Sequence, residues 1–310
     1  MFKLFIGDFD VTRVVGDVSW SDSIDTLGTQ LTFTLGYGTD VIWKGWEIAL
    51  EGRIVTLFYN NTIVFTGICV AIDRDGATPR KVTAFDYAFY LNKSDTIIQF
   101  KKIPASQALK KLLDKAKVQS SIVNITHQIT HTYRTNPAEI LKDILSQATA
   151  ATGIKYFFEM RGKVLHIFTA ISMGREYTNL DVISPKRSTS IEEMRNSILV
   201  VSNKEDSVKV EASAQDAKSI SGYGLLQKVH EIDENEVAKA KNVANQQLKA
   251  LNKVGETASL RLRGDINLRA ARIIQVKEPV TGLIGSRLIT NCANVIESGN
   301  HFVDLTLEVM

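Results

Sequence analysis

The sequence contains few cysteines and no long apolar segment. Its two cysteines, Cys69 and Cys292, lie far apart in apolar stretches typical of strands. One such pair is no disulfide framework, and no neighbouring base is evident that could activate a thiol, so we interpret both as small buried side chains. No stretch approaches the roughly 18 apolar residues of a membrane span. The acidic N-terminus does not resemble a signal peptide. We therefore expect a protein made in the cytoplasm that acts there or in a particle assembled there.

The sequence also has no excess of charge of one sign. It carries 37 basic and 34 acidic residues, a net charge of +3, and 44% hydrophobic residues. This balance is typical of a globular protein with a sizeable core, and 310 residues are enough for two or three domains. The chain as a whole is not a polycation, so we expect no specific nucleic-acid binding. The overall charge does not exclude local basic patches.

The motifs of common catalytic and metal sites are missing. The sequence has no G-x-S-x-G motif and no glycine spacing of a Walker or dinucleotide loop. His127 and His131 form an H-x-x-x-H pair, but the surrounding Ile, Val and Thr residues predict a strand, on which four residues span roughly 13 Å, too far for one metal ion. Asp73 and Asp75 lack the other ligands of a calcium loop and predict a turn. The remaining histidines stand alone and are interpreted as structural: His166, His230 and His301. We expect no cofactor, no metal ion and no catalytic residue.

Short strands are predicted for residues 1–95. Apolar residues alternate with polar ones near the N-terminus and again in "LTFTLG". Asn60-Asn61 predicts a two-residue hairpin turn because Asn tolerates positive φ, and Asp75-Gly76 predicts a second hairpin. Many short strands joined by regular turns favour a barrel or a sandwich.

The hydrophobic period changes to that of a helix in residues 96–185. "IPASQALKKLLDKAKV" places its Ala and Leu residues on one helix face. A second helix is predicted from Asn136 as N-cap, Pro137 at the first helical position, Glu139 closing a capping box and Gly153 as the stop. A hairpin turning near Arg161-Gly162 follows. These signals predict a small α+β domain.

Strands return in residues 186–310, interrupted by one long helix predicted over 234–253. Asp233 and Glu236 form a capping-box pair before this helix, and Gly255 is the expected stop. The predicted fold class is therefore α+β, mainly β. It has a β-barrel domain at 1–95, an α+β domain at 96–185, and a second β-barrel domain at 186–310 with the helix inserted. The similar character of the outer units hints at duplication, although no sequence repeat proves it.

Asp86 stands among aromatic residues in "VTAFDYAFYLNKS" and has two interpretations. A carboxyl group in apolar surroundings can have a raised pKa and act as a general acid. Alternatively, it caps the backbone where a strand gives way to a turn, and the N–H bonds that it accepts lower its pKa. We favour the cap because the sequence shows no partner for catalysis, and a lost cap should cost ~1 kcal/mol.

The order of these segments resembles the XkdQ/YqbQ-type baseplate hub family of contractile phage tails and phage-tail-like bacteriocins. The resemblance covers nearly the whole chain and depends on several soft motifs rather than a catalytic signature. Its most telling parts are the Asp86 segment and Tyr223-Gly224 with Gln227. The other matching segments are "PASQALKKLLDKA", "NPAEILKDILSQATAATGIKYFFEMRGKVLHIF", "SIEEMRNSILVV", the long helix and "NCANVIESGNHFVDLTLEV".

The resemblance implies a structural part with two barrels similar to tail-tube subunits. Three such chains would form a trimer with a pseudo-sixfold ring that joins the tail tube to the central spike. The implied partners are a second and third copy of the chain, the tail tube protein, the spike protein and other baseplate proteins, with no specific nucleic acid and no membrane insertion. The protein would be made in the bacterial cytoplasm and then become part of a virion tail or tail-like particle. Some hubs carry a fused hydrolase domain; because this sequence ends on a predicted strand, we expect no such domain and no enzymatic activity.

The sequence alone leaves two alternative functions to consider. A tail-associated cell-wall hydrolase would need paired carboxylates or a metal site in a cleft, and nothing in the sequence singles out such a pair. A glycan-binding module would expose aromatic platforms. The chain has three tryptophans, all in the first β unit: Trp20, Trp43 and Trp46. Core packing or subunit contacts explain them as well as sugar stacking does.

Overall fold

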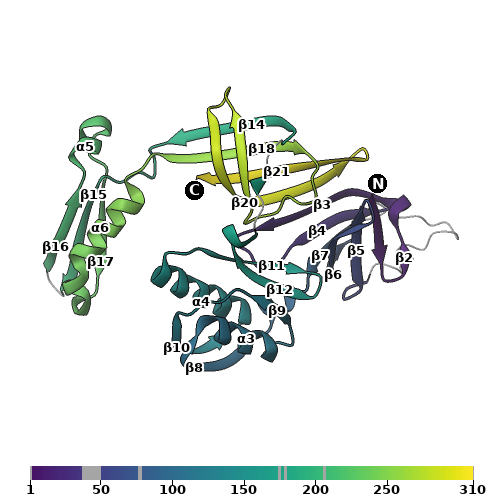
Figure 1. Ribbon diagram of the computed structural model, residues 1–310, viewed down its shortest axis with the longest axis horizontal. Helices are drawn as coiled ribbons and strands as arrows, with labels where there is room; N and C mark the ends of the chain where they lie inside the picture. Colours follow the sequence, from purple (N-terminus) through teal and green to yellow (C-terminus); the bar gives the residue numbers. More distant parts are fainter. Residues whose placement is uncertain are drawn as a thin grey trace. The chain divides into compact units, whose positions relative to one another are not determined.

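The computed structural model describes residues 2–36, 50–75, 79–173, 176–177, 180–204 and 207–309. The secondary structure is mainly β, as expected (Figure 1). The chain forms two compact units, one of residues 1–186 and 258–310 and one of residues 187–257. In the described ranges, no helix is both long and apolar enough to cross a membrane.

A large sheet holds the two ends of the first unit together. Its N-terminal strands are β1 (Phe2–Ile6), β2 (Phe9–Asp10), β3 (Val15–Ser23), β4 (Gln30–Leu35), β5 (Ile54–Tyr59), β6 (Thr62–Asp73) and β7 (Arg80–Asp86). A short 3-10 helix, η1 (Thr12–Val14), precedes β3. The C-terminal strands are β13 (Glu176–Tyr177), β14 (Val182–Ser190), β18 (Gly255–Arg263), β19 (Ile273–Glu278), β20 (Leu283–Glu297) and β21 (Asn300–Val309). Their main order is β14-β18-β21-β20-β3-β4-β7-β6-β5-β1-β2.

The antiparallel pair of β3 and β20 makes this sheet continuous. Asn291 lies opposite Ser23 and Ile296 opposite Val18. Both outer β units predicted from the sequence therefore contribute to one sheet, with an apolar cluster on each side of the shared pair. One cluster contains Phe33 and Leu57, and the other contains residues of β18 to β21.

The hairpin predicted at Asn60-Asn61 is confirmed. The two residues have φ values of +47° and +64° and join β5 to β6. β6 and β7 pair antiparallel on either side of the second predicted hairpin, whose Gly76 lies outside the described residues. At the end of this pair where Gly67 lies opposite Asp86, a Cβ at Gly67 would lie 2.1 Å from the carbonyl oxygen of Phe85, so only glycine permits the close approach of the two strands.

The α+β domain surrounds an aliphatic core. Its elements are α2 (Phe89–Lys93), β8 (Thr96–Pro104), α3 (Ala105–Lys115), β9 (Gln119–Ile122), β10 (Gln128–Thr135), α4 (Pro137–Thr152), β11 (Tyr156–Arg161), β12 (Val164–Thr169) and the 3-10 helix η2 (Ile171–Met173). β8 pairs with β10, while β11, β12 and β9 form a separate sheet. Leu109 and Leu112 of α3 and Ile144 of α4 are fully buried in this core.

The predicted ends of the second helix are confirmed. The Asn136 side chain accepts a 2.9 Å hydrogen bond from the backbone N–H of Glu139, and Pro137 begins α4. Gly153 ends the helix with φ +72°, a conformation that costs glycine little. The predicted strand around the histidine pair is confirmed only for His131, which lies in β10, because residues 123–127, which include His127, are not in a strand.

The second unit differs from the predicted third domain. Residues 187–257 form a unit of their own, with β15 (Ser197–Lys204), β16 (Ser207–Gln215), α5 (Ala217–Tyr223), β17 (Gln227–Ile232), η3 (Glu234–Lys239) and α6 (Ala240–Leu251). The expectation of one barrel over 186–310 with only a helix inserted is therefore wrong. β15 pairs with both β16 and β17, and this sheet packs against α6. The separate apolar core between them includes Ile198, Val200 and Ala244.

The long helix predicted over 234–253 is shorter in the structure. It begins as the 3-10 helix η3 and continues as α6 only to Leu251, four residues before the expected stop at Gly255. Asp233 is the N-cap residue of η3, but in the described part of the chain its side chain makes no capping hydrogen bond. Gly255 is instead the first residue of β18.

Candidate functional site

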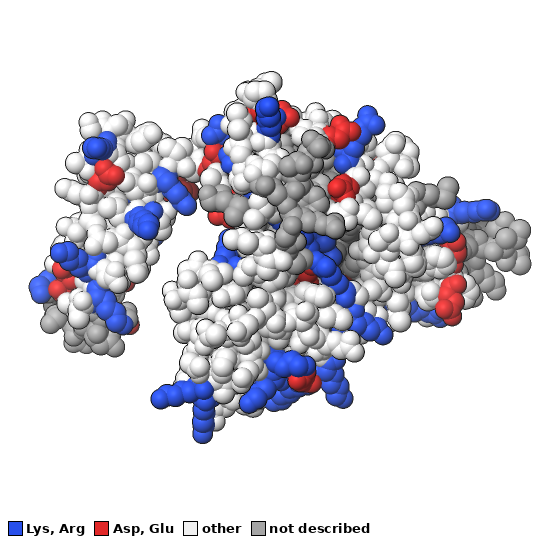
Figure 2. Space-filling model, viewed as in Figure 1, with Lys and Arg blue, Asp and Glu red and all other residues white. Residues whose placement is uncertain are grey.

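Most charged side chains lie on the surface, where both signs are present (Figure 2). Six others are concentrated where β3, β7 and β11 approach the segment between β18 and β19, and all but Arg161, which is 45% exposed, are largely buried. We call this set the ionic cluster. Its members are Asp22, Asp86, Glu159, Arg161, Arg269 and Arg272.

Asp86 is the last residue of β7 and is only 4% exposed. Its Oδ2 accepts a 2.7 Å hydrogen bond from the backbone N–H of Thr29, and its Oδ1 accepts a 2.9 Å bond from the N–H of Ala88. Gly28, at φ +114°, precedes Thr29, and a Cβ there would lie 3.1 Å from Asp86 Oδ1. The carboxylate therefore fixes two chain segments. It precedes the N-cap of α2, which is Ala88, by two residues, so its predicted place at the N-cap itself is wrong.

The prediction of a lowered Asp86 pKa is also wrong. Burial is the largest influence and raises the pKa of Asp86 to about 6, although the N–H bonds from Thr29 and Ala88 and the charge of Arg269 act in the opposite direction. The prediction considered the hydrogen bonds, which lower the pKa, but not desolvation, which raises the pKa of a carboxyl group enclosed by three parts of the fold.

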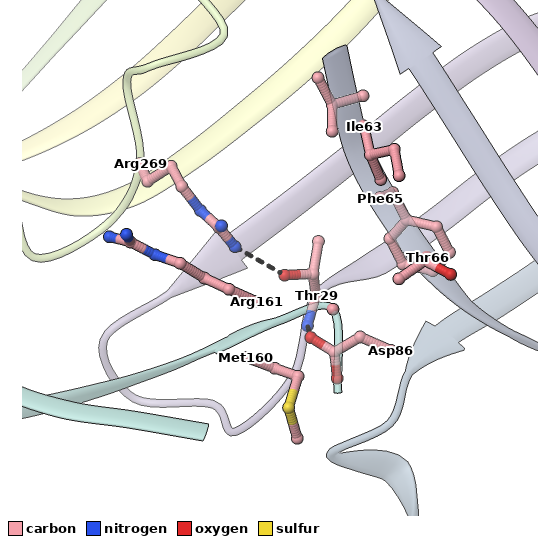
Figure 3. Close-up of a pocket in the computed structure, with 10 residues that line it drawn as sticks. Thr29, Ile63, Phe65, Thr66, Asp86, Met160, Arg161 and Arg269 are labelled. Atoms are coloured by element: carbon pink, nitrogen blue, oxygen red, sulfur yellow. Dashed lines mark hydrogen bonds between the residues drawn. The ribbon is translucent and has the colours of Figure 1, made fainter. Parts of the chain in front are cut away.

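Arg269 connects the two ends of the chain. Its Nε lies 3.4 Å from Asp22 Oδ2, and its Nη2 donates a 3.3 Å hydrogen bond to Thr29 Oγ1. The backbone N–H of Ala270 donates a further 3.1 Å bond to the same Asp22 oxygen. Figure 3 shows Arg269 pointing toward Thr29, which lies between this guanidinium and Asp86. Burial raises the pKa of Asp22, a shift that Arg269 counteracts.

Glu159 connects the α+β domain to the same segment. Arg272 binds both of its carboxylate oxygens, with Nη2 at 2.9 Å from Oε1 and 2.7 Å from Oε2. Arg269 Nε lies 3.7 Å from Oε2, and Arg161 also binds Oε1. The Glu159 and Arg272 side chains are both only 6% exposed. Burial raises the Glu159 pKa, but the charges of Arg269, Arg272 and Arg161 outweigh it and hold the pKa below its usual range.

Three carboxylates and three guanidiniums balance one another in the ionic cluster when all six are charged. Beside it lies a pocket of about 160 Å³, lined by residues that include Thr29, Asp86, Met160, Arg161 and Arg269 (Figure 3). Asp86 is enclosed, and the other two carboxylates are paired with arginine. In the described ranges no three His, Cys, Asp or Glu side chains are grouped to hold a metal ion. The arrangement is suited to holding chain segments together rather than to acid–base or nucleophilic catalysis.

A second contact joins the first β unit to the last. His301 of β21 stacks on Trp20 of β3 with 5.1 Å between ring centroids, and its ring centroid lies 4.9 Å from that of Tyr59. Its Nε2 is 2.9 Å from Asn294 Oδ1, and burial lowers the His301 pKa to about 4. Trp20 is 7% exposed and belongs to the core, so it offers no platform for a sugar. Trp43 and Trp46 lie outside the described residues.

Sequence reasoning found Asp86 but missed its partners. A weak signal was present, since Glu159 in "YFFEMR" and Arg272 in "ARIIQV" interrupt apolar runs that predict strands. Arg269 carries no such signal because it lies in an irregular segment. The cysteines agree with their predicted role, since Cys69 and Cys292 are both buried and burial raises both thiol pKa values.

Comparison with known proteins decides the family. The model of the YQBQ-like family matches residues 18–308, nearly the whole chain. This chain belongs to the YQBQ-like family. The resemblance to YqbQ-type proteins inferred from the segment order is thereby confirmed. A search of curated proteins finds no match.

Solved structures of this YQBQ-like protein's fold come from several bacteria. A 43 kDa tail protein of prophage MuSo2 from Shewanella oneidensis superposes with a TM-score of 0.74 at 11% identity, covering 99% of this chain and 97% of that one. A tail protein from Neisseria meningitidis gives a TM-score of 0.69 at 12% identity, covering 99% and 96%. A component of the type VI secretion system from E. coli gives 0.53 at 11% identity, covering 99% and 77%. At these identities the likeness establishes a shared fold.

Proposed function

We propose that this protein is the structural hub of the baseplate in a contractile tail or tail-like particle. Three copies form a ring with pseudo-sixfold symmetry on the side of the tail tube and threefold symmetry on the side of the central spike. The end-to-end match to a prophage tail protein with a TM-score of 0.74 carries this proposal, because it includes both outer β units and the parts between them. Membership of the YQBQ-like family supports it independently.

The sheet of the first unit is suited to such a ring. Each chain contributes two β units, one from the N-terminal strands and one from the C-terminal strands, so three chains supply six. In the described part of the chain, the main path of the sheet ends at β2 on one side and at β14 on the other. Free strand edges can pair with neighbouring chains, and closed rotational symmetry satisfies them. We infer that each of the two β units acts as one tube-like barrel.

The ionic cluster serves the same function by keeping the two β units and the α+β domain in one arrangement. A ring that transmits force between tube and spike needs fixed angles between its parts. Buried charges with several partners define such angles because misplacing one leaves another without compensation. We propose that the protein has no enzymatic activity and contacts the tube protein, the spike protein and other baseplate proteins after synthesis in the bacterial cytoplasm.

Electron microscopy of the purified protein, mixed with the tube and spike proteins encoded beside it, tests the ring. We expect class averages with a central channel and threefold symmetry whose inner density approaches sixfold symmetry. Separate single particles of the three proteins under all mixing conditions would contradict the proposal. Zymography on peptidoglycan tests the absence of activity: a cleared zone that persists after repurification would show a hydrolase instead.

A further inference from the structure

The positive charge of the chain is concentrated in one part of the α+β domain. Residues 93–117 contain seven lysines and two aspartates, a net charge of +5, whereas the whole chain carries +3. The remainder of the protein is therefore slightly acidic. Figure 2 shows Lys and Arg side chains along the lower side of the α+β domain, where Figure 1 places β8, β10 and α3, with few acidic groups among them.

Few of these lysines are neutralised within the described part of the chain. Lys110 binds Asp114 at 2.6 Å, one helical turn away, and Lys115 donates a hydrogen bond to the carbonyl oxygen of Ile97. The ammonium groups of the others contact no carboxylate among the described residues: Lys93, Lys101, Lys102, Lys111 and Lys117. All five side chains are exposed.

An apolar pocket lies beside two of the lysines. It has a volume of about 340 Å³ and lies between the C-terminal end of α3, α2 and the start of α4. Leu91 and Leu112, both core residues, contribute to its floor with Pro137. Its charged lining residues are Lys115, Lys117 and one carboxylate, Asp95. Tyr90 also lines the pocket and is 49% exposed, although it is aromatic. A pocket of this kind accepts an apolar side chain, and the lysines favour negative charge around it.

The backbone at Lys117 makes this residue suitable for testing the pocket. Lys117 follows the C-cap residue of α3, Ala116, and has φ +57°. Glycine adopts this left-handed conformation at lower cost than lysine. Lys102 has φ +47° and lies in β8, but it does not line the pocket. Each position therefore carries a charged side chain where glycine would suit the backbone better. The two residues also form a matched pair for an experiment, because only one of them borders the pocket.

We propose that this pocket and its lysine rim bind a segment of a partner protein in which one large apolar side chain is flanked by carboxylates. The apolar side chain enters the pocket above Leu112, and the carboxylates contact Lys115, Lys117 and the neighbouring Lys111. Charge complementarity selects an acidic segment. The aliphatic floor favours a branched apolar side chain over a nucleic acid, whose bases are flat and whose only exposed methyl group, that of thymine, is too small to fill the pocket. This surface goes beyond the hub function and does not depend on the proposed trimer.

Fluorescence anisotropy with synthetic peptides tests the proposal on the full chain. The probe is a labelled 13-residue peptide with a central Leu and three Glu residues on each side. Its controls carry Ala in place of Leu, or Lys in place of every Glu. We expect binding of the Leu/Glu peptide that weakens as salt rises, with about fivefold weaker binding for the Ala peptide and none for the Lys peptide.

Two glycine variants then locate the site. Lys117→Gly should weaken binding about three- to fivefold while leaving the melting temperature unchanged or higher, because glycine suits the positive φ. Lys102→Gly makes the same change of charge and backbone freedom away from the pocket and should alter binding less than twofold. Equal losses in both variants would show diffuse attraction and overturn the proposal. An absence of binding at 1 mM peptide would also overturn the proposal. Tighter binding of a 20-base-pair DNA, weakened by Lys117→Gly in the same way, would overturn it too and indicate a nucleic-acid site.

Discussion

The α+β domain and the ionic cluster hold this protein together in opposite ways. In the α+β domain, aliphatic side chains such as Leu109, Leu112 and Ile144 pack in a core from which water is excluded. In the ionic cluster, the buried contacts are between carboxylates and guanidiniums, with Glu159 and Arg272 both almost fully enclosed. The aliphatic core tolerates many shapes of similar volume, whereas the cluster tolerates only the arrangement in which every charge meets its partner.

The two regions also differ in the reach of their contacts along the chain. Apart from Leu27, the buried residues of the aliphatic core come from one stretch of the chain, residues 88–167. Arg269 and Asp22 of the ionic cluster are 247 residues apart, and Arg272 and Glu159 are 113 residues apart. The cluster therefore forms only when the first β unit, the α+β domain and the last β unit have come together. Whether the cluster is intact therefore indicates how these three parts are arranged, and not whether any one of them is folded.

The largest effect is expected from Glu159→Gln. The change leaves Arg272 and Arg269 buried without their shared carboxylate, and breaking such a buried pair costs about 3–5 kcal/mol. Urea denaturation followed by tryptophan fluorescence measures the loss. Asp181→Asn is the matched control, because the Arg263–Asp181 pair is 76% and 68% exposed and should contribute less than about 1 kcal/mol. Equal small losses in both variants would show that the ionic cluster does not stabilise the fold.

Leu141→Ala tests the other side of the comparison. Leu141 is fully buried in the α+β core, and truncation of such a side chain costs about 2–5 kcal/mol. We expect this loss to be the same at 0.05 and 0.5 M salt, since no charge is involved. The loss in Glu159→Gln should change only slightly with salt because its charges are shielded from solvent. If the Leu141 variant lost less than the exposed control, the description of this core would be wrong.

Asp86 predicts a pH dependence that arises in the ionic cluster. Its pKa in the folded protein is about 6, against an ordinary value of 3.8, so the folded state holds the proton more tightly than the unfolded chain. Stability from this group is therefore greatest below about pH 4 and is lost as the pH rises through 6. The difference corresponds to about 3 kcal/mol.

The comparison with Asp86→Asn isolates this contribution. Asp22, whose pKa is raised, adds a change of the same sign, and Glu159, whose pKa is lowered, opposes it, but both are present in the two proteins. Between pH 4 and pH 7 we expect the wild type to lose about 2 kcal/mol of this contribution relative to the variant in urea titrations. A relative gain over this range would mean that the hydrogen bonds and Arg269 outweigh burial.

The smallest effect is expected from a local cap. Asn136→Ala removes the hydrogen bond to the Glu139 N–H at the start of α4 and should cost about 1 kcal/mol. Asn136→Ser keeps an acceptor at the same position and should restore most of the loss. Thermal denaturation by circular dichroism is sensitive enough for this pair. An Ala variant as stable as the Ser variant would indicate that the cap does not contribute.

These contrasts explain which features could be predicted from the sequence. The start and end of α4 follow from Asn136, Pro137 and Gly153, residues within one segment whose chemistry acts locally. The hairpin at Asn60-Asn61 follows for the same reason. The separate unit at 187–257 could not be predicted because its strands show the same alternation of apolar and polar residues as the C-terminal strands of the first unit. Only the packing of Ile198 and Val200 against α6 distinguishes them.

The ionic cluster could not be predicted from the sequence, for a different physical reason. A single charged residue in a sequence does not indicate whether it faces water or a distant opposite charge. Asp86 stands out in the sequence because of its aromatic neighbours. Its pKa, however, depends on burial between segments that are distant along the chain. The segment order carried more information, because it identified the family that the YQBQ-like match then confirmed.

Light scattering of the purified protein, alone and mixed with its neighbouring spike protein, tests the hub proposal most directly. One chain has a mass of 34.4 kDa. We predict a species of three times this mass in at least the mixed sample, with the spike mass added to it. A strict monomer in both samples, with no complex at any concentration, would contradict the proposed trimeric hub.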